Sequence, residues 1–329
     1  MARNLAGHKF VNSATEKELL EICDVCQKAL SEVRRFKDGE FFVIDKITEF
    51  NRSLLVGNRL ASKELMEGGA GKGVYVTKDM TASAMINEED HLRMQVLANG
   101  MALSSVWRSI NALDNAVEER LEFDFSSNYG YLTACPTNVG TGMRASLMMH
   151  LPALVFSEQM DKVIRGVNQL GMVVRGSNGE GSESYGAIFQ LSNQQTLGIS
   201  EEEIVKKISK FGKKLVEFEI NARKKLMNEN PLLILDKVAR AEAILKSCKL
   251  IDTAEAITCI SNLRLAADMG LIKGNIFFID TLDSLMRNIQ PSHIQAVMKR
   301  YDATPDERDQ MRAQYLNKNI DDLMRTVSK

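Results

Sequence analysis

The chain changes its hydrophobic pattern near residue 200, and this change restricts the fold more than any other feature. Between residues 40 and 193, short runs rich in β-branched and aromatic residues alternate with helical stretches such as Val106–Leu121. These runs read EFFVID, GVYVT, YGYLTAC, MVVRG and AIFQLS. After Ser200, nearly every segment has helical periodicity. The pattern predicts an α+β fold, an antiparallel sheet flanked by helices, followed by an all-helical part.

The length of 329 residues exceeds what one hydrophobic core comfortably holds, so we expect two domains. Asn230 and Pro231 mark the break between them, because proline favours the first turn of a new helix. The prediction is a first domain over residues 1–229 and an all-helical domain over residues 230–329. Within the second domain, Thr304 and Glu307 flank a first-turn proline and predict the start of the last helix.

The N-terminal segment 14–36 has the apolar spacing of an amphipathic helix, and Thr15 with Glu18 forms a capping box at its start. Cys23 and Cys26 lie three residues apart in this helix. An isolated C-x-x-C without a second pair favours a place in the hydrophobic core over a metal or redox site, which stays open as the alternative.

Charge and cysteine content limit the classes of partner and compartment. The formal net charge of −1 gives no overall basic field for nucleic acid or a membrane surface, so neither is expected as a partner. The longest apolar run, around residues 147–156, is short and contains His150 and Pro152. Without a secretion signal, the five cysteines predict reduced thiols and a cytoplasmic location.

Three polar segments stand out because each is embedded in apolar or glycine-rich sequence. They are NEEDHLR at 87–93, CPTNVGTGMR at 135–144 and RGSNGEGSE at 175–183. Taken singly, an acidic run is usually a solvated loop, a lone cysteine is usually core and a glycine-rich stretch is usually a turn. Together they indicate a cleft that handles phosphate, since glycines admit backbone N–H groups and arginines add bidentate charge-assisted bonds.

These segments, in this order and spacing, resemble the signature motifs of the ATP:guanido phosphotransferases, the family of creatine and arginine kinases. The resemblance covers about residues 3–225 and includes an echo of the family's nucleotide-binding arginine motif at ARNL. LMMHLPAL, VNQLG, VVRG and GEGSE, with the helical C-terminal part, are similar to the bacterial protein-arginine kinase branch. The resemblance implies a guanido kinase catalytic domain over residues 1–229 and a dimerisation and regulatory domain over 230–329.

The resemblance also implies the catalytic residues. A guanidinium is a poor nucleophile because it is resonance-stabilised and stays protonated, so phosphoryl transfer needs carboxylates that orient it and accept a proton. Glu89 matches the base and Glu180 the second carboxylate, with Glu88 and Asp90 supporting them. Cys135 matches the family's reactive cysteine, which would steer the guanidinium. His91 is interpreted as a structural hydrogen-bonding residue.

For the nucleotide, the resemblance implies ATP and Mg²⁺, with no metal site built by the protein alone. Arg93, Arg144 and Arg175 match phosphate-binding arginines, which would offset the charge on the transferring phosphoryl group. The other expected ATP-binding residues are Ala145, Ser146, Leu147, Met148, Gly176, Ser177, Asn178, Gly179 and, where relatives often have histidine, Arg59. Family members carry two further arginines upstream of the position of Arg3, so we expect either a start further upstream or a weakened nucleotide site.

In the helical part, Arg308, Asp309, Arg312 and Ala313 fall in the sequence RDQMRA, which resembles the phosphoarginine pocket of protein-arginine kinases. Arg308 and Arg312 are one helical turn apart, so both would face a phosphorylated guanidine while Asp309 accepts its N–H groups. The alternative is an ordinary charged surface of a helix.

The function implied is transfer of the ATP γ-phosphoryl to arginine side chains of proteins, which marks them for degradation or regulation. The partners implied are arginine-bearing protein substrates, an activator protein, a AAA+ protease and a second copy of the chain. Two alternatives remain at this point: a kinase of free arginine, and a pseudokinase that binds phosphoarginine as an adaptor.

Overall fold

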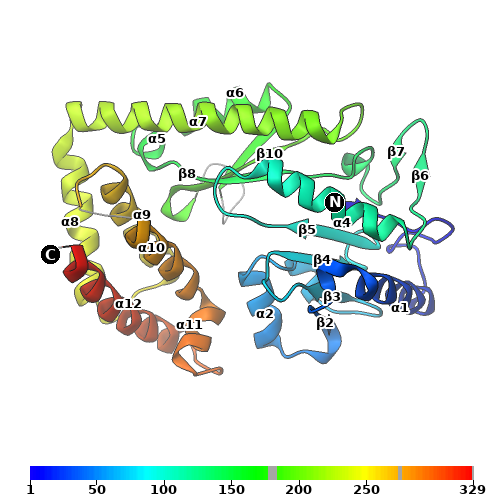
Figure 1. Cartoon of the computed structure of the whole chain (residues 1–329). Helices are drawn as coiled ribbons and strands as arrows, with labels where there is room; N and C mark the ends of the chain where they lie inside the picture. The colour runs from blue at the N-terminus through cyan, green and yellow to red at the C-terminus, as the bar shows by residue number, and fades with distance from the viewer. Residues whose placement is uncertain (177–183, 273–275, 328–329) are drawn as a thin grey trace. The chain divides into compact units, whose positions relative to one another are not determined.

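The structure, a computed structural model, describes residues 1–176, 184–272 and 276–327. The chain divides into two compact units. Unit 1 comprises Met1–Leu147 and Ser192–Lys210, and unit 2 comprises Met148–Leu191 and Phe211–Lys329. Figure 1 follows the chain from the blue N-terminus to the red C-terminus.

Unit 1 is built on an antiparallel sheet with the strand order β1-β5-β4-β3-β2. Its strands are β1 (Ala2–Arg3), β2 (Glu40–Val43), β3 (Gly73–Val76), β4 (Ala82–Ile86) and β5 (Leu92–Val96). Its helices are α1 (Glu16–Glu32), η1 (Arg34–Phe36), η2 (Ile44–Lys46), α2 (Glu49–Gly57), α3 (Lys63–Met66), α4 (Leu103–Glu118) and η3 (Pro136–Asn138). A separate hairpin pairs β6 (Phe125–Ser126) with β7 (Gly130–Tyr131).

Both faces of this sheet are covered, because its strands bury side chains in both directions. Tyr75 of β3 packs in a cluster with α1 and α4, whereas Val74 and Val76 pack on the other side against Leu55 of α2 and Leu65 of α3. This alternation is the period of two expected for a β-strand. Figure 1 shows α1 and α2 beside these strands. The predicted antiparallel sheet flanked by helices is confirmed.

The N-terminal helix begins as predicted and ends earlier. Thr15 and Glu18 form the full capping box at the start of α1. The helix ends at Glu32 because Val33 adopts an extended conformation and is buried, and η1 follows it. Cys23 and Cys26 are buried among apolar side chains, and this burial raises the pKa of the Cys23 thiol to about 11. Both are core residues of unit 1.

Unit 2 contains β9 (Met172–Gly176) and most of β8 (Ser146–His150) and β10 (Ile188–Asn193), in the order β8-β10-β9. Its helices are α5 (Pro152–Phe156), α6 (Met160–Asn168), η4 (Tyr185–Ala187), α8 (Pro231–Ser247), α9 (Thr253–Asp268), α10 (Ile276–Asn288), α11 (Pro291–Met298) and α12 (Pro305–Val327). The long helix α7 (Glu201–Glu229) begins in unit 1 and continues into unit 2.

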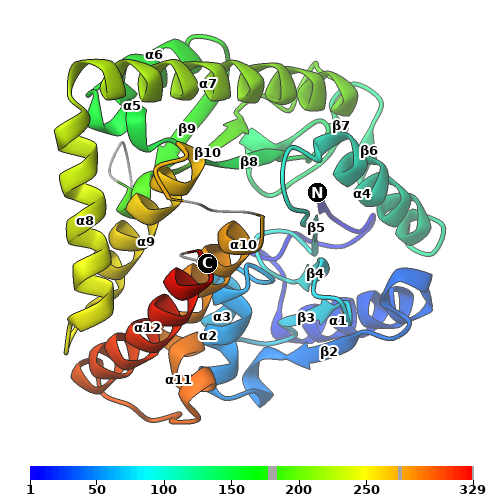
Figure 2. The same ribbon diagram turned by 60° about the vertical axis from the view of Figure 1, so that its left-hand side comes forward.

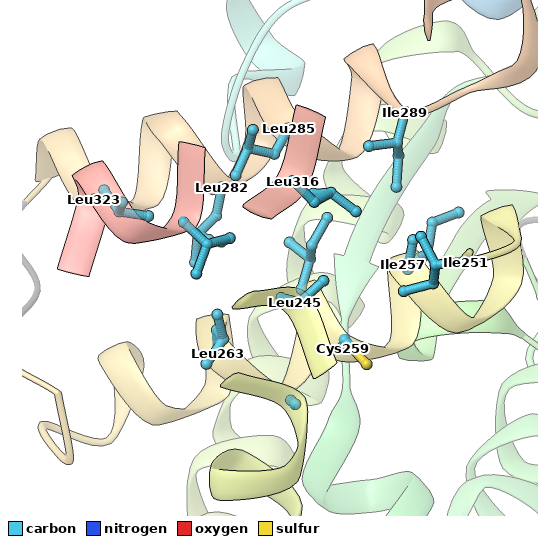
Figure 3. Packing of buried hydrophobic residues seen from close by; sticks show 14 of the residues in the cluster. Leu245, Ile251, Ile257, Cys259, Leu263, Leu282, Leu285, Ile289, Leu316 and Leu323 are labelled. Atoms are coloured by element: carbon cyan, nitrogen blue, oxygen red, sulfur yellow. The ribbon is translucent and has the colours of Figure 1, made fainter. Parts of the chain in front are cut away.

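The core of unit 2 is formed by apolar residues of α8, α9, α10 and α12. Leu245, Leu263, Leu282 and Leu316 are fully buried in this cluster, and Figure 3 shows their side chains meeting between the four helices. Figure 2 shows α10 beside α12 from another side. The predicted helical C-terminal part is therefore confirmed.

The helix caps along this part match the sequence pattern. Ser200 and Glu203 exchange capping hydrogen bonds at the start of α7, and Thr304 and Glu307 do so at the start of α12. Asn230 separates α7 from α8, whose first residue is a proline. The domain division at residue 230 stays a prediction, while the compact units divide the chain at other positions.

Candidate active site

The acidic segment of unit 1 is the turn between two antiparallel strands. Ile86 ends β4 and pairs with Leu92, which begins β5, so residues 87–91 form the link. Asn87 adopts the left-handed conformation, with φ of 54°, that such a sharp link needs. Its side-chain amide donates to the carbonyls of Leu19 (2.9 Å) and Gly71 (3.0 Å). These bonds fix the backbone that carries Glu88 and Glu89.

Glu88 is held inside this turn by Arg93. The two side chains form an ion pair at 2.7 Å, with Glu88 only 5% exposed and Arg93 45% exposed. Burial alone would raise the pKa of Glu88, but the charge of Arg93 and hydrogen bonds from Ser62 and Arg93 outweigh it and lower the pKa. Glu88 is therefore a carboxylate that stabilises the position of Arg93.

Glu89, the next residue, is exposed. The side-chain amide of Asn138, three residues after Cys135, donates to the Glu89 carboxylate at 3.5 Å, and Cys135 is close enough to lower the pKa of Glu89 as a hydrogen-bond donor. Partial burial and the negative charges of Asp90 and Glu88 raise the pKa of Glu89. A carboxylate with a raised pKa is a better proton acceptor, which is the property that a general base requires.

Cys135 lies at the N-cap of η3 and is half-buried. Its sulfur is 3.0 Å from the hydroxyl of Thr137. The loop that follows is held by Thr196, whose hydroxyl interacts with the carbonyls of Thr137 and Val139, each at 2.8 Å. Neither Thr137 nor Thr196 is marked by the sequence pattern, because their roles depend on contacts rather than on a charged motif.

The predicted phosphate-binding segment follows on the way into β8. Arg144 is exposed and donates to the hydroxyl of Ser192 at 3.3 Å. The Ala145 N–H donates to the side-chain carbonyl of Asn193 at 2.8 Å, so the backbone here is fixed. In β8, Ser146 and Met148 are exposed, whereas Leu147 is buried. Alternation along the strand leaves only some of the predicted residues accessible to a nucleotide.

The remaining predicted ATP-binding residues are not all in unit 1. Arg59 follows α2 in the left-handed conformation, with φ of 60°, and its side chain is exposed. Arg175, exposed, and Gly176, buried, end β9 in unit 2. The predicted residues Ser177, Asn178, Gly179 and Glu180 lie outside the described residues. The structure thus brings Glu89 and Cys135 together, and the assignments of the other site residues stay predictions.

Arg3, part of the motif that echoes the nucleotide-binding arginines, is completely buried. It forms an ion pair with Asp114 at 2.6 Å and lies over the ring of Tyr131, 3.4 Å from the centroid. His91 is also buried: its Nδ1 accepts from the Leu5 N–H and its Nε2 bonds to the Lys9 carbonyl. Both residues therefore stabilise unit 1, and the structural interpretation of His91 is confirmed.

The predicted phosphoarginine residues lie in the first turns of α12, within unit 2. Arg312 is 1% exposed, and its guanidinium donates to the carbonyls of Ile251 (2.6 Å) and Ile289 (2.9 Å) and to Asp309 (2.6 Å). Arg308 is half-buried and donates to the Ala303 carbonyl at 2.8 Å. A ligand that reached Arg312 would have to replace existing contacts. Ala313 is buried, and the pocket stays a prediction.

Comparison with known proteins identifies the family. Residues 21–222 match the C-terminal catalytic domain of the ATP:guanido phosphotransferases, and residues 231–329 match the C-terminal domain of protein-arginine kinase McsB. Protein-arginine kinases from Halothermothrix orenii and Bacillus pumilus are each 39% identical to this chain. These alignments cover 97% of this chain in both cases, and 90% and 88% of the respective relatives. The chain belongs to the protein-arginine kinase family of ATP:guanido phosphotransferases.

Solved structures of the wider family share the fold of this kinase. A lombricine kinase is 26% identical with a TM-score of 0.60, over 67% of this chain and 64% of that one. The duplicated taurocyamine kinase from Schistosoma mansoni, with bound transition-state analogue components, gives 26% identity and a TM-score of 0.59 over 67% of this chain and 32% of that one. This chain is therefore a phosphotransferase of the ATP:guanido phosphotransferase family. The predicted family, fold and enzyme class are confirmed.

Among the described residues, no group of three or more His, Cys, Asp or Glu side chains has a geometry that could hold a metal ion. In the same part of the chain, no helix is long and apolar enough to cross a membrane.

Proposed function

We propose that this chain transfers the γ-phosphoryl group of ATP to arginine side chains of proteins. The observation that carries the proposal is the approach of Glu89 to the loop of Cys135 and Asn138 in a guanido phosphotransferase domain. A carboxylate with a raised pKa beside a thiol suits a planar cation that must be oriented and deprotonated. The C-terminal match to a protein-arginine kinase domain supports proteins as the source of that arginine.

In the proposed step, a guanidino nitrogen of the substrate attacks the γ-phosphorus of ATP. The new P–N bond forms as the P–O bond to ADP breaks, and the nitrogen's proton passes to Glu89. Because the carboxylate and Cys135 lie side by side, they would contact neighbouring N–H groups of one guanidinium and align its nitrogen for in-line attack. Glu180, which lies outside the described residues, is proposed as the second carboxylate.

The developing negative charge needs cationic partners. Arg93 and Arg144 are exposed in unit 1 and would contact phosphate oxygens through charge-assisted hydrogen bonds. Arg175 would complete the set. Bound Mg²⁺ supplies further charge neutralisation on the nucleotide. The guanidinium of Arg93 already pairs with Glu88, so a bound nucleotide would share it with that carboxylate.

The finer partners belong to the same proposal. The relatives are named protein-arginine kinases, and this supports protein substrates here. We further propose a homodimer, an activator protein and delivery of the product to a AAA+ protease, and phosphoarginine binding at Arg308 and Arg312. A cytoplasmic location agrees with the five free cysteines.

The test is a transfer assay with γ-labelled ATP on unfolded casein and, separately, on free arginine. Acid-labile, base-stable label on casein is the expected result. Glu89→Gln should lower kcat by at least ~10²-fold, the usual contribution of a general base, with ATP binding retained. The matched control is Glu122→Gln, an exposed glutamate of the same unit, which should leave activity unchanged.

Each other outcome contradicts a defined part of the proposal. Label on free arginine but not on casein would make the chain a kinase of free arginine. ATP binding without label on either substrate would favour the phosphoarginine-binding pseudokinase. Full activity in Glu89→Gln would remove that residue from its role as base.

A further inference from the structure

Asp90, the neighbour of the exposed Glu89, is buried. It is 2% exposed, and its Oδ1 accepts hydrogen bonds from the Ala134 backbone N–H at 2.7 Å and from Nδ2 of Asn4 at 2.6 Å. Ala134 directly precedes Cys135. One buried carboxylate oxygen therefore connects the residue next to Glu89 with the residue next to Cys135.

Asn4 ties the same two segments together from a third part of the chain. Its side chain is buried, with Nδ2 donating also to the Leu132 carbonyl at 3.1 Å and Oδ1 accepting from the His91 N–H at 2.9 Å. Its own carbonyl accepts from the Asp124 N–H at 2.8 Å. Asn4 thus contacts both residues 90–91 and residue 132 with one amide group.

These bonds are short and shielded from water, so loss of one leaves a buried partner unsatisfied. The side-chain amide of Asn4 is suited to this place because it is both donor and acceptor. A carboxylate there would accept from His91 but face Asp90 with like charge. A hydrophobic side chain would lose the hydrogen bonds to residues 90–91 and to residue 132. The arrangement therefore specifies the two residue types.

We propose that Asn4 and Asp90 act as a positioning pair that sets the distance between the Glu89 carboxylate and the Cys135 thiol. The catalytic consequence rests on the proposed function, since it matters only if both groups contact one guanidinium. Neither member of the pair touches the reacting atoms. Misplacement by about 1 Å costs on the order of 10²-fold in rate, so the pair is expected to influence kcat far more than the KM for ATP.

The test uses the full chain and four variants. Asp90→Ala removes the acceptor of both bonds, whereas Asp90→Asn retains an oxygen for Ala134 and for Asn4. Asn4→Asp places two carboxylates together. The exchange Asn4→Asp with Asp90→Asn restores one donor and one acceptor across the pair. Each variant is assayed for transfer to casein and, without ATP, for the alkylation rate of Cys135 by iodoacetamide with peptide mass spectrometry.

Asp90→Ala is expected to lower kcat by ~10- to 100-fold with little change in KM for ATP, and to raise Cys135 alkylation several-fold. Cys248, half-buried in unit 2, is the internal reference and should not change. Asp90→Asn should retain most of the kcat. The exchange should recover activity that Asn4→Asp alone loses, and thermal unfolding identifies any variant that does not fold.

The proposal is overturned if folded Asp90→Ala keeps the wild-type kcat and Cys135 alkylation rate. Equal acceleration at Cys135 and Cys248 would also overturn it, because that indicates general loosening. If folded Asp90→Asn, which keeps the acceptor oxygen, loses as much kcat as Asp90→Ala, the hydrogen bonds from Asn4 and Ala134 are not what sets the geometry. A wild-type chain without phosphotransfer would refute the proposed function alone, because alkylation still reports on the pair.

Discussion

Replacing Arg3 by methionine separates a structural arginine from a phosphate-binding one. In the folded chain the Arg3 guanidinium pairs with Asp114, donates to the carbonyls of Ala2 and Thr141, and covers the ring of Tyr131. Side-chain exposures are 0% for Arg3 and 4% for Asp114. Arg3→Met therefore leaves a buried carboxylate without its counter-ion.

Removing one member of a buried pair costs about 3–5 kcal/mol of unfolding free energy. At a urea m-value of about 2 kcal/mol/M, a loss of about 4 kcal/mol lowers the unfolding midpoint by about 2 M. Trp107, the single tryptophan of the chain, lies in α4, the helix that carries Asp114, and packs against the core cluster of unit 1. Its fluorescence therefore follows the unfolding of unit 1.

The double variant Arg3→Met with Asp114→Leu is the control for this explanation. In the wild type, Nε of Arg3 and Oδ1 of Asp114 have no hydrogen-bond partner, so the cost of removing the pair from water is only partly recovered. We expect the double variant to recover most of the lost stability. An unchanged urea midpoint in Arg3→Met, together with a raised KM for ATP, would refute the structural role and make Arg3 a nucleotide ligand.

Three further predictions concern other sites. Partial burial and neighbouring carboxylates raise the pKa of Glu89 above its ordinary value of 4.5. In a plot of kcat/KM against pH, activity should therefore fall on the acid side with a midpoint above pH 4.5, because a protonated Glu89 cannot accept a proton. In Asp90→Asn this midpoint should move to lower pH, because one neighbouring negative charge is removed. Arg308→Ala should abolish stimulation by phosphoarginine and lower the free energy of unfolding by no more than about 1 kcal/mol. Arg312→Ala should lower the free energy of unfolding, measured in urea, by about 3 kcal/mol, because Arg312 is buried. Glu219→Ala should destabilise unit 2 by about 3–5 kcal/mol, measured by circular dichroism, since the buried carboxylate accepts two N–H groups of α5 and pairs with an arginine.

The sequence was sufficient to predict those elements that depend on residues close together in the chain. The capping box of Thr15 and Glu18 involves residues three apart, and its hydrogen bonds formed as the pattern indicates. The predicted helix Val106–Leu121 is found as α4, shifted to Leu103–Glu118. Runs such as GVYVT and AIFQLS became β3 and β10, because their alternating side chains fit a sheet.

The run YGYLTAC shows a limit of predicting strands from β-propensity. Only Gly130 and Tyr131 form a strand, because the next residues find partners that lie far away in the sequence. The Ala134 N–H bonds to the side chain of Asp90, and the Leu132 carbonyl accepts from Asn4. The β-propensity of a run cannot indicate such contacts with distant side chains. A strand forms only where these backbone groups pair with the backbone of another strand.

Arginines illustrate the same limit within the candidate sites. Arg3, Arg93 and Arg312 each occur in a motif that suggests anion binding, and sequence alone gives them equal standing. Burial separates them: Arg3 and Arg312 are 0% and 1% exposed and each already bonds to two carbonyls and a carboxylate, whereas the Arg93 side chain is 45% exposed. A guanidinium can add a phosphate only if donors remain accessible, because replacing buried bonds costs their full desolvation penalty. Arg93 therefore meets the physical condition for a nucleotide ligand, whereas an anion could reach Arg312 only if α12 moved away from the carbonyls of Ile251 and Ile289.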